Sequence, residues 1–330
     1  MIEARGLTKR FEDFIAVNRL DLDVQEGELL ALLGPNGAGK TTTVRMLSAI
    51  LRPTAGQARV AGYDVIREPD RVRREIGMLT EQPGLYLRMS GLEYLTFYGR
   101  LYGIDDARIH ARALALFDRF AMQGAAERRL GTYSKGMRQK VGLIRAMLHD
   151  PAVLLLDEPT SAMDPHSARL VRNAIAELRR DRRSIILCTH NLNEAELLAD
   201  RIAIIHQGEI VALDTAAGLK RRLLGDPQME LRLDRPLDGH RAALEALVSV
   251  DWVRGDLIRY RTPEPAVNNP RLVQRLTELG LGVVGLYPVS QSLEEVYLRV
   301  VNRDEASGLT GKEELAKPGA ELARNGKGEM

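Results

Sequence analysis

A glycine-rich loop between an apolar strand and a helix constrains this chain more than any other feature. The strand covers Leu29 to Leu33, and the helix that begins near Lys40 repeats apolar residues at helical spacing. The loop and the first helical turn consist of Gly34, Pro35, Asn36, Gly37, Ala38, Gly39, Lys40, Thr41 and Thr42. Glycines let the backbone N–H groups turn inward, and the helix N-terminus adds a positive dipole, so the loop is typical of a phosphate cradle. The flanking strand and helix favour a nucleoside triphosphate site over a chance match, with Lys40 at the β- and γ-phosphates and Thr41 on Mg²⁺.

Length and composition indicate about two domains in a protein of the reducing cytoplasm. The chain has 330 residues and a formal net charge of +2, which gives no general attraction to nucleic acid. Its longest apolar runs have the size of strands, whereas a membrane-spanning helix needs about 20 apolar residues. The first residues lack the apolar stretch of a signal peptide. The single cysteine, Cys188, lies in an apolar run, so we expect a buried thiol and no internal disulfide.

Strand and helix patterns divide the chain into two units and a tail. Residues 1–222 begin with short strands and continue with alternating strands and helices, which favours an α/β fold around a largely parallel sheet. Helical periodicity over about 84–149 predicts a helical subdomain inserted into this unit. Residues 223–301 follow the order β-α-β-β-α-β, which predicts a small ferredoxin-like α+β domain with a final helix from Ser292. Residues 302–330 are rich in Lys, Glu, Gly and Ala, and we expect them to form a disordered tail.

Three polar side chains follow the ends of two predicted core strands. Asp157 and Glu158 come after the apolar run Val153 to Leu156, and His190 follows the run Ser184 to Thr189. Alone, the two carboxylates fit a solvated turn equally well, and a single histidine is more often structural. Parallel sheets bind ligands at the carboxyl ends of their strands, however, and the phosphate loop also leaves such an end. We therefore predict Asp157 as a Mg²⁺ ligand, Glu158 as the base for the attacking water, and His190 as a γ-phosphate contact.

A further helix start lies between these motifs. The stretch from Tyr133 to Lys140 leads into an apolar helix, and Ser134 has the position of its N-cap. As an N-cap it needs no other role. A helix N-terminus that carries a hydroxyl and Gly136 is also an anion site, so the segment is a second candidate phosphate contact.

The ordered motifs resemble the ATP-binding subunit of an ATP-binding cassette (ABC) transporter over residues 1 to about 220. The resemblance is carried by the phosphate loop, the Ser134 helix start, Leu154 to Pro159, Ser161 to Asp164, and Thr189-His190. Three further stretches, at 81–86, 133–139 and 292–298, resemble the bacterial drug and sodium exporter branch. The resemblance implies a RecA-like P-loop core with an antiparallel β part. It also implies an ATP-hydrolysing motor for a separate transmembrane permease that exports drugs, ions or lipid-like compounds.

The same resemblance implies an assembly and assigns further residues. Two copies would form a head-to-tail dimer on the cytoplasmic face of the membrane, each ATP held between one copy's phosphate loop and the other's Ser134, Gly136 and Met137. Lys40, Glu158 and His190 would be the catalytic residues. Phe11 matches an aromatic that stacks on adenine, although it fits the core too, and Val17 matches a nucleotide contact. Asp164 matches an acidic residue that crosses the dimer interface.

The sequence departs from the usual pattern of the resembled family at two places. The family usually has Gln where Glu81 stands, and adjacent side chains of an extended segment point to opposite faces, so only Glu81 or Gln82 can enter the site. We expect Glu81 to enter it as a metal ligand. Lys135 and Met137 replace the usual Gly and Gln, while Ser134 and Gly136 remain.

A soluble ABC-type ATPase that acts on ribosomes or nucleic acid is the alternative function. Such proteins typically carry two cassettes or a long coiled coil, and this chain shows one cassette and no sustained heptads. A separate possibility is that the C-terminal domain regulates the subunit, by sensing a ligand or by locking the dimer.

Overall fold

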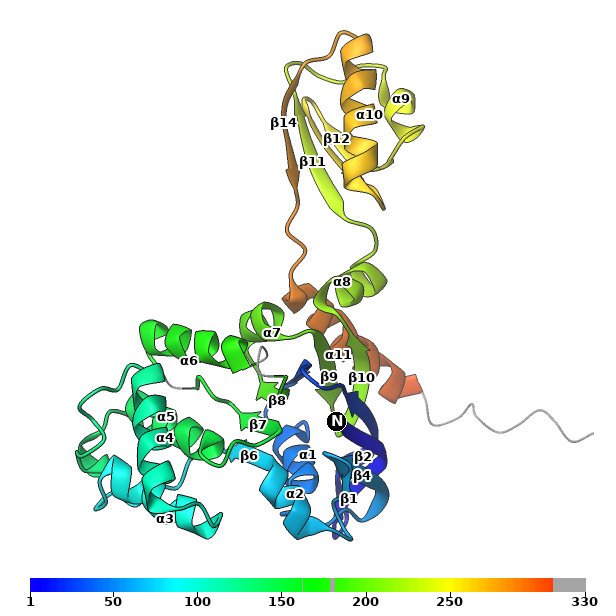
Figure 1. The fold of residues 1–330 in the computed structure, drawn as a ribbon. Coiled ribbons are helices and arrows are strands. Elements are labelled where there is room, and N and C mark those ends of the chain that lie inside the picture. The colour runs from blue at the N-terminus through cyan, green and yellow to red at the C-terminus, as the bar shows by residue number, and fades with distance from the viewer. Residues whose placement is uncertain (162, 179–181, 311–330) are drawn as a thin grey trace, which may run out of the picture.

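A six-stranded sheet forms the centre of the molecule (Figure 1). The computed structural model describes residues 1–161, 163–178 and 182–310. The sheet has the order β10-β9-β3-β8-β7-β6, and all neighbours are parallel except β10 and β9. Its strands are β3 (Leu29–Leu33), β6 (Ile76–Leu79), β7 (Val153–Asp157), β8 (Ser184–Thr189), β9 (Arg201–His206) and β10 (Glu209–Asp214). The largely parallel sheet expected from the sequence is confirmed.

Side chains of the central strands alternate between two apolar layers, which explains why β3, β7 and β8 are buried throughout. Leu155 and Ile186 pack toward a second, antiparallel sheet, whereas Leu154 and Ile185 pack toward helices. The antiparallel sheet has the order β2-β1-β4-β5. This layer contains β1 (Ile2–Phe11), β2 (Phe14–Val24), α1 (Lys40–Leu47), β4 (Ala55–Val60), β5 (Tyr63–Asp64) and α2 (Pro69–Glu75).

A helical subdomain covers the other side, as the periodicity predicts. Its first long helix begins with a capping box, because Ser90 accepts from the Glu93 N–H while the Glu93 carboxylate accepts from the Ser90 N–H. Tyr94 and Phe117 are buried at its centre. This layer contains α3 (Gly91–Leu101), α4 (Asp106–Arg119), the 3-10 turn η1 (Leu130–Thr132), α5 (Lys135–Met147), α6 (Pro165–Leu178) and α7 (Leu192–Leu198).

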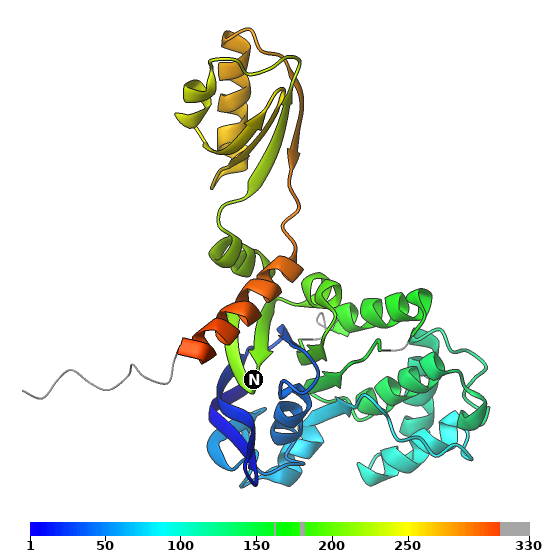
Figure 2. The ribbon, with the colours of Figure 1, turned by 180° about the vertical axis from the view of Figure 1, so that it is seen from behind.

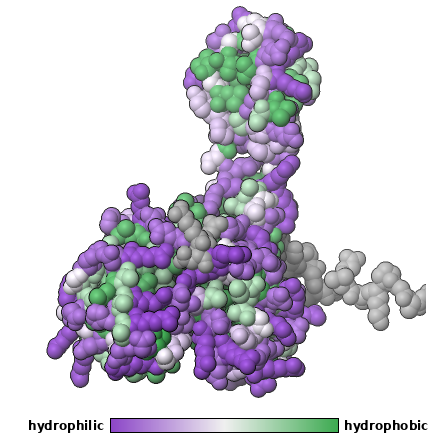
Figure 3. Space-filling view, viewed as in Figure 1, coloured by the Kyte–Doolittle hydropathy of each residue, from purple (hydrophilic) through white to green (hydrophobic). Residues whose placement is uncertain are grey.

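A small domain stands apart from this core, and two chain segments connect it (Figure 1). It contains β11 (Gln228–Leu233), α9 (Arg241–Glu245), β12 (Ser249–Arg254), β13 (Leu257–Arg261), α10 (Pro265–Glu278) and β14 (Val283–Pro288). We call residues 228–288 the accessory domain. Its sheet is antiparallel with the order β12-β13-β11-β14. The element order is the predicted one, and the ferredoxin-like assignment stays a prediction. The space-filling view shows apolar side chains on one face of this domain (Figure 3).

The last helix corrects the predicted domain division. Helix α11 (Leu293–Thr310) packs on α8 (Ala216–Leu224) and the central sheet, as Figure 2 shows from behind. Its side chains Leu293, Val296 and Val300 share a buried cluster with Ala31 and Leu33 of β3. The sequence assigned this helix to the accessory domain because the helix follows it in the chain. Its apolar face instead covers a side of the central sheet.

Helix α11 also bears on the predicted tail, because it continues to Thr310 and so enters the segment 302–330 that we expected to be disordered. Residues 311–330 lie outside the described part of the chain. Among the residues described, no helix is both long and apolar enough to cross a membrane.

His149, just after α5, is a mostly buried titratable group. Its ring stacks on Tyr102, with ring centroids 3.8 Å apart. The Ile76 carbonyl oxygen lies 2.9 Å from Nε2 and can only accept, so Nε2 donates and Nδ1 carries no proton. Nδ1 is buried without a hydrogen-bond partner in the described part of the chain. Burial lowers the pKa of His149 to about 4.

Lowering the pH from 7 to 5 should therefore destabilise the protein by about 2 kcal/mol through His149. The unfolded imidazole binds a proton near pH 6.5, whereas the folded one does so only near pH 4, so this stability is lost as the pH falls between those values. His149→Gln keeps an N–H donor for Ile76 and should remove this part of the pH dependence. Urea unfolding of both proteins at the two pH values measures it, and identical pH dependence would contradict the assignment.

Candidate functional site

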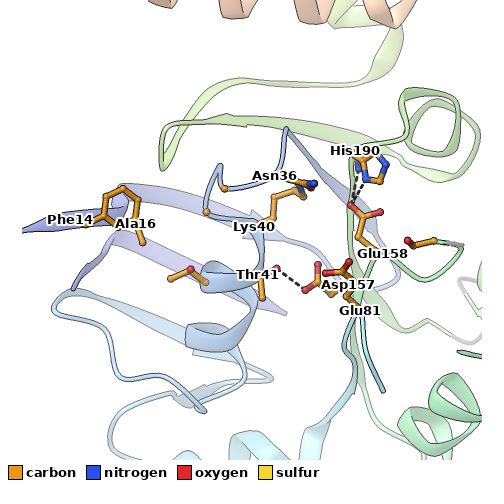
Figure 4. A pocket seen from close by; sticks show the side chains of 13 residues that line it. Phe14, Ala16, Asn36, Lys40, Thr41, Glu81, Asp157, Glu158 and His190 are labelled. Carbon is orange, nitrogen blue, oxygen red and sulfur yellow. Dashed lines mark hydrogen bonds and ion pairs between the residues drawn. The ribbon is translucent and has the colours of Figure 1, made fainter. Parts of the chain in front are cut away.

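A pocket of about 380 Å³ opens where β3, β7 and β8 end (Figure 4). We call it the loop pocket, because the phosphate loop forms one side of it. Of the predicted loop residues, those that line the pocket are Asn36, Gly37, Gly39, Lys40, Thr41 and Thr42. Gly34, Pro35 and Ala38 belong to the same loop but are not among the lining residues. Asp157, Glu158, His190 and Glu81 line the opposite side, so the structure brings the main predicted site residues together.

The loop has a shape that requires glycine. Gly37 and Gly39 have φ angles of 82° and 105°, in the left-handed region that side chains disfavour. A Cβ at Gly34 would lie 2.3 Å from the Ile205 carbonyl oxygen, so the backbones approach too closely for any other residue. Lys40 is buried, and its Nζ donates to the carbonyl oxygens of Gly34 at 2.7 Å and Pro35 at 3.0 Å. The ammonium is thus held against the loop that would surround the phosphates.

Thr41 and Asp157 form the centre of the predicted metal site. The Thr41 hydroxyl donates to an Asp157 carboxylate oxygen at 2.8 Å. Burial raises the pKa of Asp157, and the neighbouring Glu158 raises it further, while the Thr41 hydrogen bond lowers it. Glu81 also lines the pocket, and Gln82 does not. Three oxygen-bearing side chains therefore face one space, which is the donor set that Mg²⁺ prefers.

Glu158 and His190 form a second polar pair in the pocket. One Glu158 carboxylate oxygen accepts from His190 Nδ1 at 2.7 Å and from the His190 backbone N–H at 3.1 Å. The Glu158 side chain is 11% exposed and that of His190 is 58% exposed. Glu158 adopts a left-handed φ of 51°, and its N–H donates to the Cys188 carbonyl at 2.9 Å. The strained backbone and the double hydrogen bond fix the carboxylate at the pocket wall.

The aromatic side of the pocket contains Phe14, which was not predicted, and the stacking role of Phe11 stays a prediction. Phe14 and Ala16 line the pocket, whereas Phe11 does not. Phe11 lies opposite Phe14 in the β1–β2 hairpin, and the Lys9 ammonium lies 4.9 Å from its ring centroid. Val17 is fully buried in the core and is not a pocket residue. Phe14 and Ala16 alternate along β2 and so share a face, a period-two signal that was present in the sequence.

The remaining predicted residues lie at the starts of α5 and α6, and none of them lines the loop pocket. Ser134 is exposed, and its hydroxyl accepts from the Met137 N–H at 3.2 Å as an N-cap. A Cβ at Gly136 would lie 3.7 Å from the Ser167 side chain, so α5 and α6 begin side by side. Asp164 accepts from the Ser167 N–H at 2.9 Å, and hydrogen bonds from this serine lower the pKa of Asp164. We call Ser134, Gly136, Met137 and Asp164 the helix-start patch.

Ser161 is a pocket residue that the sequence analysis did not name as a ligand contact. The sequence does place Ser161 three residues after Glu158, at the start of the stretch Ser161 to Asp164 that carries the family resemblance. The pocket therefore combines residues of the phosphate loop with the segments that follow β6, β7 and β8.

Comparisons with known proteins agree with this geometry. The ABC transporter family model matches residues 17–161. The ABC transporter ATP-binding protein NatA of Bacillus subtilis is 40% identical over 64% of this chain and 88% of its own length. The daunorubicin/doxorubicin resistance ATP-binding protein DrrA of Streptomyces peucetius is 39% identical over 90% of this chain and 91% of its own.

A solved ATP-binding subunit of an ABC transporter is 28% identical, with a TM-score of 0.64 over 68% of this chain and 94% of that one. None of these proteins supports the alternative of an ATPase that acts on ribosomes or nucleic acid. With a P-loop, two carboxylates and a histidine in one pocket and such relatives along its length, the chain belongs to the ATP-binding ATPase subunits of ABC transporters.

Proposed function

We propose that two copies of this ATPase close head to tail on ATP, each completing the other's site. The observation that carries this proposal is the separation of the loop pocket from the helix-start patch on one chain. Ser134 offers an exposed hydroxyl at a helix N-terminus, which is an anion-binding arrangement, and it does not line the loop pocket of its own chain. A second copy turned by 180° would place this patch over the first copy's phosphates. A solved cassette of the same fold, with a TM-score of 0.61, is dimeric.

The pocket residues suit hydrolysis of ATP to ADP and phosphate. Lys40 would exchange its carbonyl partners for the β- and γ-phosphate oxygens. Thr41, Asp157 and Glu81 would hold Mg²⁺, which would neutralise phosphate charge when bound. Glu158 would accept a proton from the attacking water, and His190 would orient this carboxylate through Nδ1 while contacting the γ-phosphate.

Glu81→Ala should reduce Mg²⁺-dependent ATP turnover by about tenfold or more, because a carboxylate at the metal site disappears. The apparent affinity for Mg²⁺ should fall as well. Phosphate release measured over a series of Mg²⁺ concentrations tests both effects. Gln82→Ala is the matched control, since Gln82 does not line the pocket. Unchanged Mg²⁺-dependent turnover in Glu81→Ala would rule out the metal role.

The proposed task of the motor is to drive a separate membrane permease that exports drugs, ions or lipid-like compounds. One relative is a daunorubicin/doxorubicin resistance protein, which supports a drug substrate. A groove of about 290 Å³ beside the subdomain offers a docking place for the permease on the cytoplasmic side, with Ile50, Tyr98 and Tyr102 on its walls. Arg145 lines this groove and donates to the Pro83 carbonyl at 2.9 Å, two residues beyond Glu81. A docked helix would thus touch a segment that also enters the ATP pocket.

Purification of the tagged chain from detergent-solubilised membranes should bring down a polytopic membrane protein. Ile50 is 63% exposed in the groove, so Ile50→Glu should weaken this capture severalfold by burying a charge against the partner. Leu197→Glu is the control, because Leu197 is 70% exposed on α7 and does not line the groove. Capture of ribosomes or DNA in place of a membrane protein would contradict the proposed task.

A further inference from the structure

Glu194 is a buried carboxylate between the loops that carry Glu158 and His190. It lies on α7 and is only 2% exposed. One carboxylate oxygen accepts from the Thr160 hydroxyl at 2.6 Å, and the other accepts from the Thr189 hydroxyl at 2.8 Å. Thr160 stands two residues after Glu158, and Thr189 stands directly before His190. Glu194 therefore joins the segment after β7 to the segment after β8.

The bonds around Glu194 leave little freedom to either segment. The Thr189 hydroxyl donates to Glu194 and also accepts from the Asn191 N–H at 3.0 Å. The Asn191 side chain in turn accepts from the Glu194 N–H at 3.1 Å and caps α7. A hydroxyl that donates in one direction and accepts in the other has a fixed orientation. The carboxylate thus holds the end of β8 in one register against α7.

A carboxylate in this place needs a reason, because burial disfavours its charge. Burial raises the pKa of Glu194, whereas the Thr160 and Thr189 hydrogen bonds lower it. Glu158 nearby raises this pKa too, and Arg172 of α6 lowers it. A helix cap alone does not require a charged group, since Asn191 already caps α7 with its own side chain. What the carboxylate adds is two strong acceptors, one for each segment.

We infer that Glu194 is a positioning residue for ATP hydrolysis. By holding Thr160 and Thr189 together, it keeps Glu158 and His190 within the 2.7 Å hydrogen bond that orients the base. The inference rests on the proposed function, because it takes Glu158 and His190 to act on ATP. Thr160 also begins the segment that leads through Ser161 to Asp164. The Glu194 carboxylate therefore also holds the first residue of this segment, which in the proposed dimer faces the second copy.

Glu194→Gln keeps the size of the side chain and removes one of its two acceptors. We expect kcat for ATP to fall about tenfold or more, because a displaced base loses its alignment, while KM and the Kd for ATP change by less than about twofold. Glu196→Gln is the matched control on the same helix, since Glu196 pairs with Lys220 at the surface. The rate of ATP turnover in each sample is divided by the amount of ATP that the sample binds, so that unfolded molecules do not lower the apparent kcat. Equal kcat in the two variants would overturn the inference, and so would a loss of ATP affinity as large as the loss of kcat.

Variants of Thr160 distinguish a positioning role of Glu194 from a general contribution to stability. Thr160→Val should reduce kcat like Glu194→Gln, Thr160→Ser should restore most of it, and the double variant Glu194→Gln/Thr160→Val should lose little more than either single one. Fully additive losses would contradict a shared contact. Glu158→Gln tests the underlying function separately: if it abolishes turnover while Glu194→Gln is normal, only the positioning role fails. Normal turnover in Glu158→Gln would instead remove the proposed function.

Discussion

Replacing Glu158 with Gln should leave ATP binding intact and slow hydrolysis by about 10²- to 10⁴-fold. The amide is nearly the same size, and its oxygen can still accept from His190 Nδ1, so the pocket keeps its shape. It cannot take a proton from the attacking water, however, and the reaction loses its base. Equilibrium binding of a fluorescent ATP analogue and steady-state release of phosphate measure the two properties side by side.

The matched control for this variant is Glu177→Gln, because Glu177 lies on the surface of α6 and pairs with Arg119. It should bind and hydrolyse ATP as the unaltered protein does. Normal phosphate release by Glu158→Gln would show that another group is the base. Loss of ATP binding in Glu158→Gln would show instead that the carboxylate shapes the nucleotide site.

The second large effect should appear when two inactive variants are mixed. Lys40→Ala removes the phosphate contact of the loop pocket, and Ser134→Arg places a bulky charge on the helix-start patch. Each variant alone should be nearly inactive, because both sites of its dimer carry the defect. In a head-to-tail mixed dimer, one site collects both defects and the other has none. Since half of the dimers are mixed and one of their two sites is intact, activity should return to roughly a quarter.

The experiment uses two differently tagged variants, purified separately, mixed with ATP and assayed for phosphate release. Mixing two samples of the same variant is the control, and it should restore nothing. Restoration only in the heterologous mixture would locate the complete site between chains. No restoration, although affinity capture shows that the mixed dimer has formed, would contradict the shared site.

The sequence predicted the phosphate end of the site because the chemistry lies at the ends of strands that are easy to recognise. Apolar runs identify β3, β7 and β8, and parallel pairing then forces Thr41, Asp157 and His190 to the same edge. These positions follow from local pattern plus one topological rule. Alternation of side chains in an extended segment predicts only that one of Glu81 and Gln82 enters the pocket. The family resemblance selects Glu81, and Glu81 is the one that lines the pocket.

The aromatic end was harder to predict because it depends on how a hairpin is bent. Strands β1 and β2 pair with several register shifts between Ala4 and Arg10, and each shift changes which side chains share a face. The stacking role of Phe11 follows from the family resemblance and not from strand periodicity, and it stays a prediction. The structure places Phe14 on the pocket, on the face of β2 that it shares with Ala16.

Helix α11 was misassigned for a different reason. Its apolar residues Leu293, Val296 and Val300 identify one buried face but not the surface that buries it. That choice depends on which side of the sheet remains uncovered after α7 and α8 have packed. A contact with Ala31 and Leu33, more than 250 positions away in the chain, leaves no mark in the local sequence.

The return of α11 to the core changes what truncation means for this protein. The accessory domain is an insertion held at both ends, and its two connecting segments touch where Gln291 donates to the Asp226 carbonyl at 3.3 Å. A stop codon after α8 would therefore remove more than the domain, since it would also strip the cover from Ala31 and Leu33 on the strand that leads into the phosphate loop. A clean excision would join Gly225 to Ser292 and keep the helix. A different domain whose N- and C-termini lie equally close together could replace the accessory domain without disturbing the ATPase core.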